Sequence, residues 1–265
     1  MTQTYDSHET QETNGTEETN ETQETNGLNA SIESNETEES GKGPEGGLTP
    51  LDFWTTAGAN GIVLDKTQVD ALQRYHDELL YWNAKVNLIS RKDENQIWSK
   101  HILHSLTLLK YVTFPKKARV LDLGTGGGLP GIPLKIARPD LRVTLCDSVR
   151  KKMTMTAMFA DHTGMKNIEA VTSRVEDMGE NPHYQAAFDV IVSRAVADTM
   201  LLMEWVRPLV APGGFCAFLK GGDLKIELSN ARKTYPGVDI REIQIDLFGA
   251  PWFKTDEKKI VVVGP

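Results

Sequence analysis

The sequence predicts an α/β protein built around a mostly parallel, doubly wound sheet. Two observations support this prediction. From residue 116 onward, short apolar segments alternate with helix-like segments, which is the pattern of repeated strand–helix–strand units. The segments VLDL at 120–123 and DVIV at 189–192 are apolar at nearly every position, as expected for strands that are buried on both faces.

The elements of this predicted sheet domain, residues 116–265, follow in order along the chain. Strands are expected at 118–123, 142–148, 167–178 (with its exit loop), 188–197, 213–221, 238–248 and 258–264. Helices are expected after the first strand up to residue 137, and then at 150–163, 199–209 and 223–233. The last two strands are most simply an antiparallel pair, which predicts seven strands in one sheet.

A small helical extension is predicted before the sheet, at residues 51–115. Asp65 or Thr67 is a suitable N-cap for a helix that ends near residues 81–83. Asp93 is a suitable N-cap for a second helix that ends before the first strand.

The first 50 residues differ in composition from the rest of the chain. They contain 12 acidic residues, one lysine, and the heptapeptide ETQETNG twice, at 9–15 and 21–27. Such a segment buries too little apolar surface to offset the entropy of ordering, so residues 1–50 are predicted to be a disordered, acidic, low-complexity tail. We expect it to be dispensable for a chain that begins near Gly47. Its N-x-[ST] sequons follow no signal peptide and are interpreted as a consequence of the Asn and Thr content.

The charge of the chain divides at the same boundary. The chain has 37 acidic and 29 basic residues, and the tail contains 12 of the acidic residues and one of the basic residues. Residues 51–265 therefore have 25 acidic and 28 basic residues, a net charge of about +3. This charge permits a polyanionic partner without requiring one.

No run approaches ~20 consecutive apolar residues, so no membrane span is expected. Cys146 and Cys216 lie in strand-like runs, which favours a reduced, cytoplasmic protein, and we expect a monomer that binds no metal.

A glycine-rich turn, DLGTGGGLPG at 122–131, follows the first strand. Glycine lets the backbone approach a ligand closely, and the next helix offers free N–H groups. The turn also satisfies the G-x-G-x-x-G dinucleotide fingerprint, which is a weak signal by itself. The carboxylate of Asp122 would repel a pyrophosphate, whereas it suits S-adenosylmethionine, which carries an ammonium and a sulfonium but no phosphate. A second interpretation, compatible with the first, is that Asp122 braces the loop by accepting backbone N–H bonds.

Three further positions fit a nucleoside. Asp147 ends the second strand, where a carboxylate can accept both ribose hydroxyls; the alternative is that it caps the following helix. Val175 can pack on an adenine while the backbone or Glu176 meets its amino group, and a solvated turn is the alternative for Glu176.

Seven segments share the order and spacing of one known family. They are WNAKVNLIS (82–90), HILHSL (101–106), DLGTGGGLPGIPL (122–134), LCDS (145–148), SRVED (173–177), FDVIVSRAVA (188–197) and LKG (219–221). In these segments the chain resembles the bacterial small-subunit ribosomal RNA guanine-N7 methyltransferases, the RsmG or glucose-inhibited division protein B family. The resemblance implies a class I S-adenosylmethionine-dependent methyltransferase fold. It also implies a guanine in small-subunit (16S) ribosomal RNA, free or in the assembling 30S particle, as substrate. It implies cofactor contacts by Gly124, Leu129, Val175, Glu176 and Arg194.

The chain departs from this family at two positions. His104 stands where the family usually has Asp, in the pattern His-x-x-Asp-Ser, so any influence of that Asp on the site is weakened or changed. Gly127 stands where the loop often has Pro or Ala, which makes the loop looser. The acidic tail is not part of the family pattern.

The chemistry of the acceptor favours guanine N7. Methyl transfer is an in-line displacement that depends mainly on alignment. N7 has an in-plane lone pair and no proton to lose. Enzymes that methylate exocyclic amines commonly carry an Asn/Asp-Pro-Pro-aromatic turn, where this chain has SRAV at 193–196. Methylation at cytosine C5 needs a cysteine nucleophile, whereas the two cysteines lie in strands expected to be ~14 Å apart. N7 is hard to reach in paired RNA, so an exposed or splayed base is expected.

Cationic and polar residues complete the predicted site. Arg194 and Lys220 follow the fourth and fifth strands and are candidate catalytic residues that orient the methionine carboxylate or an RNA phosphate; surface cations are the alternative. Glycines of the turn are candidate cofactor contacts, namely Gly124, Gly126 and Gly128. Candidate phosphate contacts form a rim at Lys85, Asn87, Arg91, Lys100 and His101. Ordinary solvated residues are the alternative for the lysines, and a core histidine is the alternative for His101, which falls on an apolar stripe. Alternative functions are a small-molecule or other RNA methyltransferase, a non-catalytic RNA-binding factor, and an NAD-dependent oxidoreductase.

Overall fold

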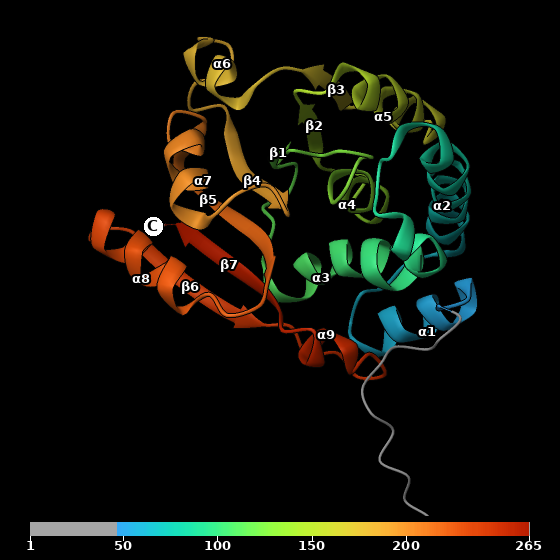
Figure 1. Cartoon of the computed structure of the whole chain (residues 1–265). Helices are drawn as coiled ribbons and strands as arrows, with labels where there is room; N and C mark the ends of the chain where they lie inside the picture. Colours follow the sequence, from blue (N-terminus) through green and yellow to red (C-terminus); the bar gives the residue numbers. More distant parts are fainter. Residues whose placement is uncertain (1–46, 265) are drawn as a thin grey trace, which may run out of the picture. The chain divides into compact units, whose positions relative to one another are not determined.

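The structure is a computed structural model, and it describes residues 47–264 (Figure 1). The predicted acidic tail lies outside the described residues up to position 46. Thr49 is the N-cap of the first helix, α1 (Pro50–Ala59), and Asp52 completes a capping box with it. Regular structure is therefore present from residue 50, where the composition of the sequence changes.

Seven strands form one sheet in the order β3-β2-β1-β4-β5-β7-β6. The strands are β1 (Arg119–Leu123), β2 (Arg142–Asp147), β3 (Ile168–Thr172), β4 (Phe188–Arg194), β5 (Val210–Gly221), β6 (Asp239–Gln244) and β7 (Lys258–Gly264). Strands β1 to β5 pair in parallel, and β7 runs antiparallel to both β5 and β6. The predicted doubly wound, seven-stranded sheet with an antiparallel last pair is confirmed.

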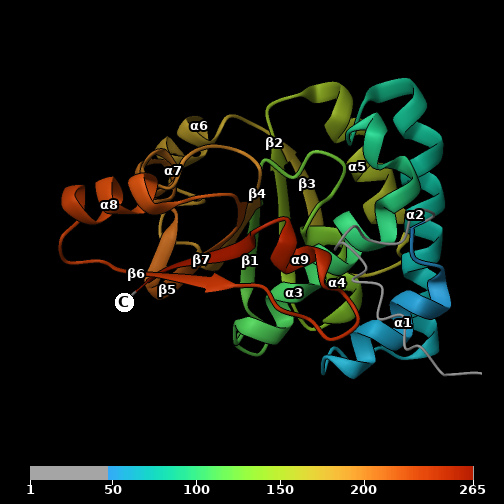
Figure 2. The ribbon, with the colours of Figure 1, turned by 60° about the horizontal axis from the view of Figure 1, so that its bottom comes forward.

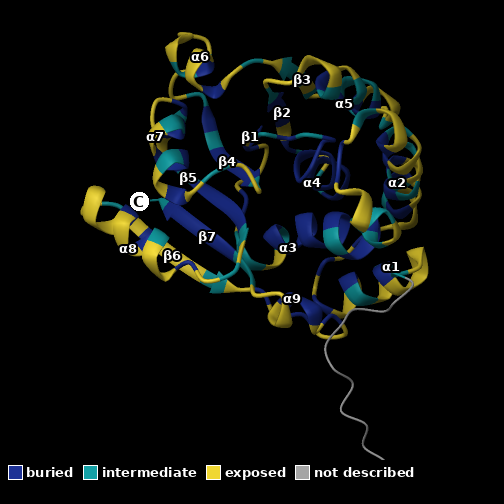
Figure 3. Cartoon of the chain, viewed as in Figure 1, coloured by how far each residue is buried: buried dark blue, intermediate teal, exposed yellow. Residues whose placement is uncertain are grey.

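Helices cover both faces of the sheet (Figures 1 and 2). One face carries α6 (Val175–Glu180), α7 (Thr199–Val206) and α8 (Lys225–Thr234), and the other carries α3 (His104–Tyr111), α4 (Gly131–Ala137) and α5 (Arg150–His162). Neighbouring residues of one strand therefore enter different cores: Val120 packs in the core with α3 to α5, and Leu121 in the core with α6 to α8. Burial on both faces explains the continuous apolar runs of the sequence (Figure 3).

The N-terminal region begins with α1, a helix that was not predicted, and the two predicted helices follow with differences of their own. Asp65 caps α2 (Lys66–Val86) as predicted, but the helix is longer than expected, and its C-cap is Asn87, which has a left-handed backbone conformation. Asp93 is not a cap. It lies inside a 3-10 helix, η1 (Arg91–Gln96), which leads into a π-helical turn, η2 (Ile97–Leu103), and then α3.

Tertiary hydrogen bonds explain why Asp93 does not cap a helix. The carboxamide of Asn83, in α2, accepts a hydrogen bond from the Ile89 N–H at 2.8 Å and donates to the Glu94 carboxylate at 2.7 Å. The segment between the helices is therefore tied back onto α2. Local capping signals do not contain these contacts.

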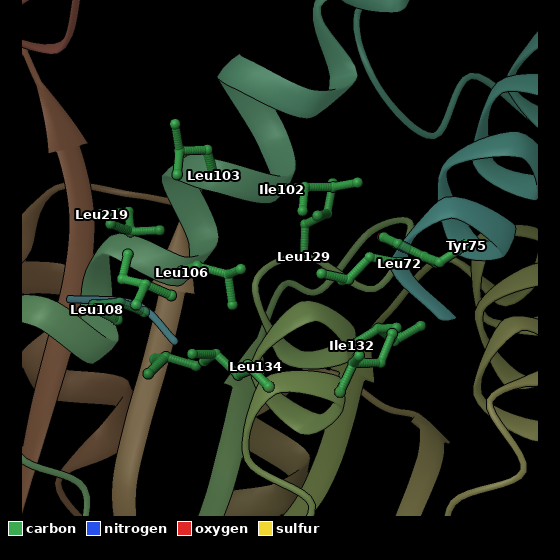
Figure 4. Packing of buried hydrophobic residues seen from close by; sticks show 14 of the residues in the cluster. Leu72, Tyr75, Ile102, Leu103, Leu106, Leu108, Leu129, Ile132, Leu134 and Leu219 are labelled. Atoms are coloured by element: carbon green, nitrogen blue, oxygen red, sulfur yellow. The ribbon is translucent and has the colours of Figure 1, made fainter. Parts of the chain in front are cut away.

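The N-terminal helices pack on the segment that follows the glycine turn (Figure 4). Leu72 and Tyr75 of α2 and Ile102 of η2 belong to one buried cluster with Leu129 and Ile132, which lie beside and within α4. A short helix that was not predicted, α9 (Trp252–Thr255), joins the same cluster through its buried aromatic rings. The division at residue 115 into an extension and a sheet domain stays a prediction.

Candidate active site

A pocket of about 500 Å³ opens at the carboxyl ends of β1, β2 and β4. Parallel strands bring these ends to one edge of the sheet, where doubly wound proteins bind their ligands. We call it the donor pocket. The predicted cofactor residues that line it are Gly124, Gly126, Leu129, Asp147, Val175, Glu176 and Arg194.

Gly128 is the one predicted cofactor residue that does not line the donor pocket. Its φ is +100°, and a Cβ at this position would lie 2.4 Å from the Ile132 side chain. Gly128 is therefore required for the turn of the loop onto α4, and its contact with the cofactor stays a prediction.

Side chains from neighbouring helices fix the glycine loop. The Tyr75 hydroxyl of α2 donates to the Gly127 carbonyl at 2.9 Å, and the Thr156 hydroxyl of α5 donates to the Gly126 carbonyl at 2.6 Å. Sequence reasoning missed both residues because they lie 52 and 30 positions from their partners. The extension thus contributes directly to the shape of the donor pocket.

Asp122 lies beneath the loop, fully buried, and does not line the donor pocket. Its Oδ2 accepts hydrogen bonds from the Thr125 hydroxyl at 2.6 Å and the Gly131 N–H at 2.7 Å. The bracing interpretation is confirmed, and any influence of Asp122 on a cationic ligand stays a prediction that would act through the loop amides. Burial raises the pKa of Asp122 to about 7, against these hydrogen bonds and nearby Arg194, which lower it. Near neutral pH its charge is partial, which weakens the electrostatic argument against a pyrophosphate.

Asp147, at the end of β2, holds two backbone amides. Its carboxylate accepts from the Gly126 N–H at 3.1 Å and from the Val149 N–H at 2.9 Å. The N-cap residue of α5 is Val149, so the interpretation of Asp147 as a helix cap is wrong. Each carboxylate oxygen keeps lone pairs that can accept ribose hydroxyls from the donor pocket.

A second pocket, of about 390 Å³, adjoins the first. Arg194 and Ala195 line both, so they form the boundary between the two. We call it the acceptor pocket. The other residues that line it are Asp93, Lys100, His101, His104, Leu219, Lys220, Gly221, Asp256 and Lys258.

Arg194 is held at this boundary by a histidine. Its Nη1 donates to Nδ1 of His101 at 2.7 Å and lies 3.5 Å from the Lys100 carbonyl. Because a guanidinium is always a donor, the imidazole accepts here and carries its own proton on Nε2. Burial, with the nearby cations Arg194 and Lys100 and with His104, lowers the pKa of His101 to about 2, so the ring stays neutral.

The predicted phosphate rim is only partly at the surface. Lys85, Asn87 and Arg91 are exposed, and the Lys85 Nζ lies 3.9 Å from the centroid of the Tyr81 ring. The structure does not place His101 on this rim, since it is 4% exposed and bonded to Arg194. Its apolar neighbours in the sequence were the signal that it is buried.

The Lys220 ammonium is held by protein hydrogen bonds, and the His104 imidazole is buried. The Lys220 Nζ donates to the Ala197 carbonyl at 2.5 Å and to the Glu227 carboxylate at 2.7 Å. These bonds connect β5 with the segment after β4 and with α8, and the catalytic role of Lys220 stays a prediction. His104 is buried against Phe253, and burial lowers its pKa to about 3, so it stays neutral.

The two cysteines lie in the core, as predicted. Cys146 is in β2 and Cys216 is in β5, with β1 and β4 between them. Burial is the main cause that raises the pKa of each thiol to about 12, so neither supplies a thiolate near neutral pH.

Replacing both cysteines with alanine is therefore expected to leave methyl transfer within about threefold of the wild type, because no covalent step is lost. The measurement is the initial rate with tritiated S-adenosylmethionine, corrected for the folded fraction. Because Cys146 also lines the donor pocket, the rates are measured at saturating cofactor. A hundredfold loss in the folded Cys146→Ala variant under these conditions, with Cys216→Ala unaffected, would contradict the expectation.

Within residues 47–264, every helix is too short or too polar to cross a bilayer. The same residues contain no group of three or more His, Cys, Asp or Glu side chains arranged to hold a metal ion.

Comparison with known proteins identifies the family. The family model GidB, described as rRNA small subunit methyltransferase G, matches residues 68–254. Ribosomal RNA small subunit methyltransferase G of Chlorobium luteolum is 41% identical, covering 77% of this chain and 84% of that protein. The protein of the same name from Brevibacillus brevis is 34% identical, covering 76% and 84%. A solved structure of a putative S-adenosylmethionine-dependent methyltransferase from Methanococcus maripaludis is also similar, with a TM-score of 0.49 and 14% identity, covering 76% and 94%. The predicted class I S-adenosylmethionine-dependent fold is confirmed, and the chain belongs to the GidB family of rRNA small subunit methyltransferases.

Proposed function

We propose that this protein transfers the methyl group of S-adenosylmethionine to N7 of a guanine in small-subunit (16S) ribosomal RNA, free or in the assembling 30S particle, in the cytoplasm. The names of its relatives support the RNA substrate. The observation that carries the proposal is the pair of adjoining pockets with Arg194 and Ala195 at their boundary. A methyl donor in one and a base in the other would meet there.

The residues of the donor pocket fit S-adenosylmethionine. Asp147 would accept the ribose hydroxyls, and Val175, which is 7% exposed, would pack on the adenine. Glu176, exposed in the first turn of α6, would meet the adenine amino group. Gly124 and Gly126 leave the backbone bare where the methionine end would lie. The cofactor supplies an electrophilic methyl group on a sulfonium.

The residues at the boundary favour alignment over proton transfer. N7 attacks with a lone pair and loses no proton, so the protein has only to hold the base edge against the methyl group. His101 is neutral, and its Nδ1 is occupied by Arg194. Ala195 is exposed and has a φ of +55°, a conformation that costs energy for a residue with a Cβ and is often found at functional sites. We assign to Arg194 the orientation of the methionine carboxylate or of an RNA phosphate.

The RNA would be held mainly through its phosphates. Lys85, Asn87 and Arg91 are exposed on the segment that leads to the donor pocket through Leu88. The Lys151 Nζ donates to the Lys85 carbonyl at 3.2 Å, which places the basic start of α5 beside them. Such contacts position RNA without reading its sequence.

Two measurements test the proposal. Calorimetric titration is expected to show binding of S-adenosylmethionine and none of NADH. Incubation of the full chain with tritiated cofactor and small ribosomal subunits from cells that lack this enzyme is expected to label one guanine, located by chemical cleavage at N7-methylguanine. Binding of NADH alone would contradict the cofactor. Label at another atom, or only in small molecules, would contradict the substrate.

A further inference from the structure

The acceptor pocket contains a feature that phosphate binding does not explain. Two carboxylates, Asp93 and Asp256, line it together with its cations. RNA is a polyanion, so carboxylates in its pocket oppose binding unless they contact a group that donates hydrogen bonds. The bases carry such donors, and the phosphates and their bridging oxygens do not.

Asp93 is the better placed of the two. Its side chain is 26% exposed, whereas Asp256 lies at the exposed end of α9. The Asp93 carboxylate is 3.5 Å from the Lys100 Nζ and 3.7 Å from Nε2 of His101. Both distances are at or beyond the hydrogen-bond limit, so the carboxylate retains acceptor capacity for a ligand.

The proposed reaction fixes which edge of a guanine enters this pocket. If N7 faces the donor pocket at the Arg194 boundary, then N1–H and the exocyclic amine lie on the far side of the base, inside the acceptor pocket. These two parallel donors match the two oxygens of a carboxylate. The neighbouring O6 is an acceptor and matches Lys100, which lies beside Asp93. Adenine presents no N–H at N1 and so does not match.

We propose that the acceptor pocket holds a guanine extruded from the RNA, and that Asp93 selects it by accepting hydrogen bonds from N1–H and the exocyclic amine, with Lys100 at O6. This inference rests on the proposed function and adds the means by which the base is chosen. The competing explanation is that Asp93 only orients His101 and, through it, Arg194.

Inosine separates the two explanations because it lacks the exocyclic amine and keeps N7. The methylated position is first located with wild-type protein. Small subunits are then reconstituted with 16S RNA that carries either guanosine or inosine at that position. The full-length wild type and its Asp93→Asn and Asp256→Asn variants are compared by kcat/KM, and the affinity for S-adenosylmethionine is measured by calorimetry.

The wild type and Asp256→Asn are expected to prefer guanosine by about tenfold or more, because inosine lacks one of the two hydrogen bonds to a charged carboxylate. Asp93→Asn is expected to lose about tenfold or more on guanosine RNA and to distinguish the two RNAs by less than about threefold, with unchanged cofactor affinity. Equal losses on both RNAs would overturn the inference and support the competing explanation. Equal rates of the wild type on both RNAs, or lost preference in Asp256→Asn only, would overturn it as well.

Two controls keep this outcome distinct from failure of the proposed function. If the wild type labels no guanine N7, the proposed function itself is wrong, and the failure does not come from the role assigned to Asp93 in the acceptor pocket. If Asp93→Asn does not bind the cofactor with wild-type affinity, Asp93→Ser replaces it in the same comparison, and retained preference for guanosine in that variant would overturn the inference.

Discussion

Replacing Arg194 with alanine is expected to reduce methyl transfer by about a hundredfold or more. The guanidinium lines both pockets, and its bond to His101 fixes it at the boundary where the methyl group would be transferred. A half-buried, preoriented charge at such a position is worth about 10²–10³ in rate. The variant also leaves the His101 Nδ1 without its donor, so a loss of about 1–3 kcal/mol in the free energy of unfolding is expected.

The assay separates these two effects. The rate with tritiated cofactor and small subunits is normalised to the folded fraction, which is obtained from denaturant unfolding. Arg207→Ala is the matched control, because Arg207 is an exposed arginine at the end of α7 and lies outside both pockets. Arg194→Lys keeps the charge and is expected to recover only part of the rate. Turnover of Arg194→Ala within twofold of the wild type would refute the assigned role.

Replacing Asp122 with alanine is expected to lower the free energy of unfolding by about 2–4 kcal/mol and to weaken cofactor binding by about tenfold or more. The substitution leaves the buried Gly131 N–H without its acceptor and releases Thr125, so the loop of the donor pocket loses its brace. Asp122→Asn is the matched control, since its amide oxygen can accept both hydrogen bonds. Denaturant unfolding and calorimetry measure the two quantities. Equal stability of the alanine variant and the wild type would show that the brace contributes nothing.

The difference in stability between the wild type and Asp122→Asn is expected to depend on pH. Burial raises the pKa of Asp122 from 3.8 to about 7, so between these values the folded protein binds more protons than the unfolded chain. The stability that this group contributes is therefore present below its unfolded pKa and is lost as the pH rises through about 7. We therefore expect the free energy of unfolding of the wild type to fall, relative to that of Asp122→Asn, as the pH rises from 5 to 8. A difference that is constant over this range would contradict the raised pKa.

The fold could be predicted because its signals are local. Strands buried on both faces leave continuous apolar runs such as 189–192, and the alternation of strand and helix dictates a parallel sheet. The carboxyl ends of parallel strands must meet, so Asp147 and Arg194 could be assigned to one edge before any coordinates were known. The N-cap at Asp65 is equally local, since its partner Gln68 is three residues away.

The roles of several site residues could not be predicted in this way. Aspartate is a common helix N-cap, so the sequence predicted that role for Asp93. In the structure, Asn83 donates a hydrogen bond to Glu94, the residue after Asp93, and Asp93 lines the acceptor pocket. The sequence left open whether Asp122 acts on a ligand or braces the loop, and its burial beneath the loop supports the brace. For Asp93 the deciding partners are side chains whose distance in space the sequence does not encode.

The sequence by itself determined the sheet, the glycine turn after β1, the family and the cofactor, because each depends on residue types at short spacings. Only the tertiary structure decided that Arg194 is anchored by a neutral histidine 93 positions away, that Tyr75 holds the glycine loop, and that two pockets share one wall. These contacts arise where the N-terminal helices pack on the sheet. Packing between distant segments depends on the shapes of both surfaces at once, and no short stretch of chain contains that information.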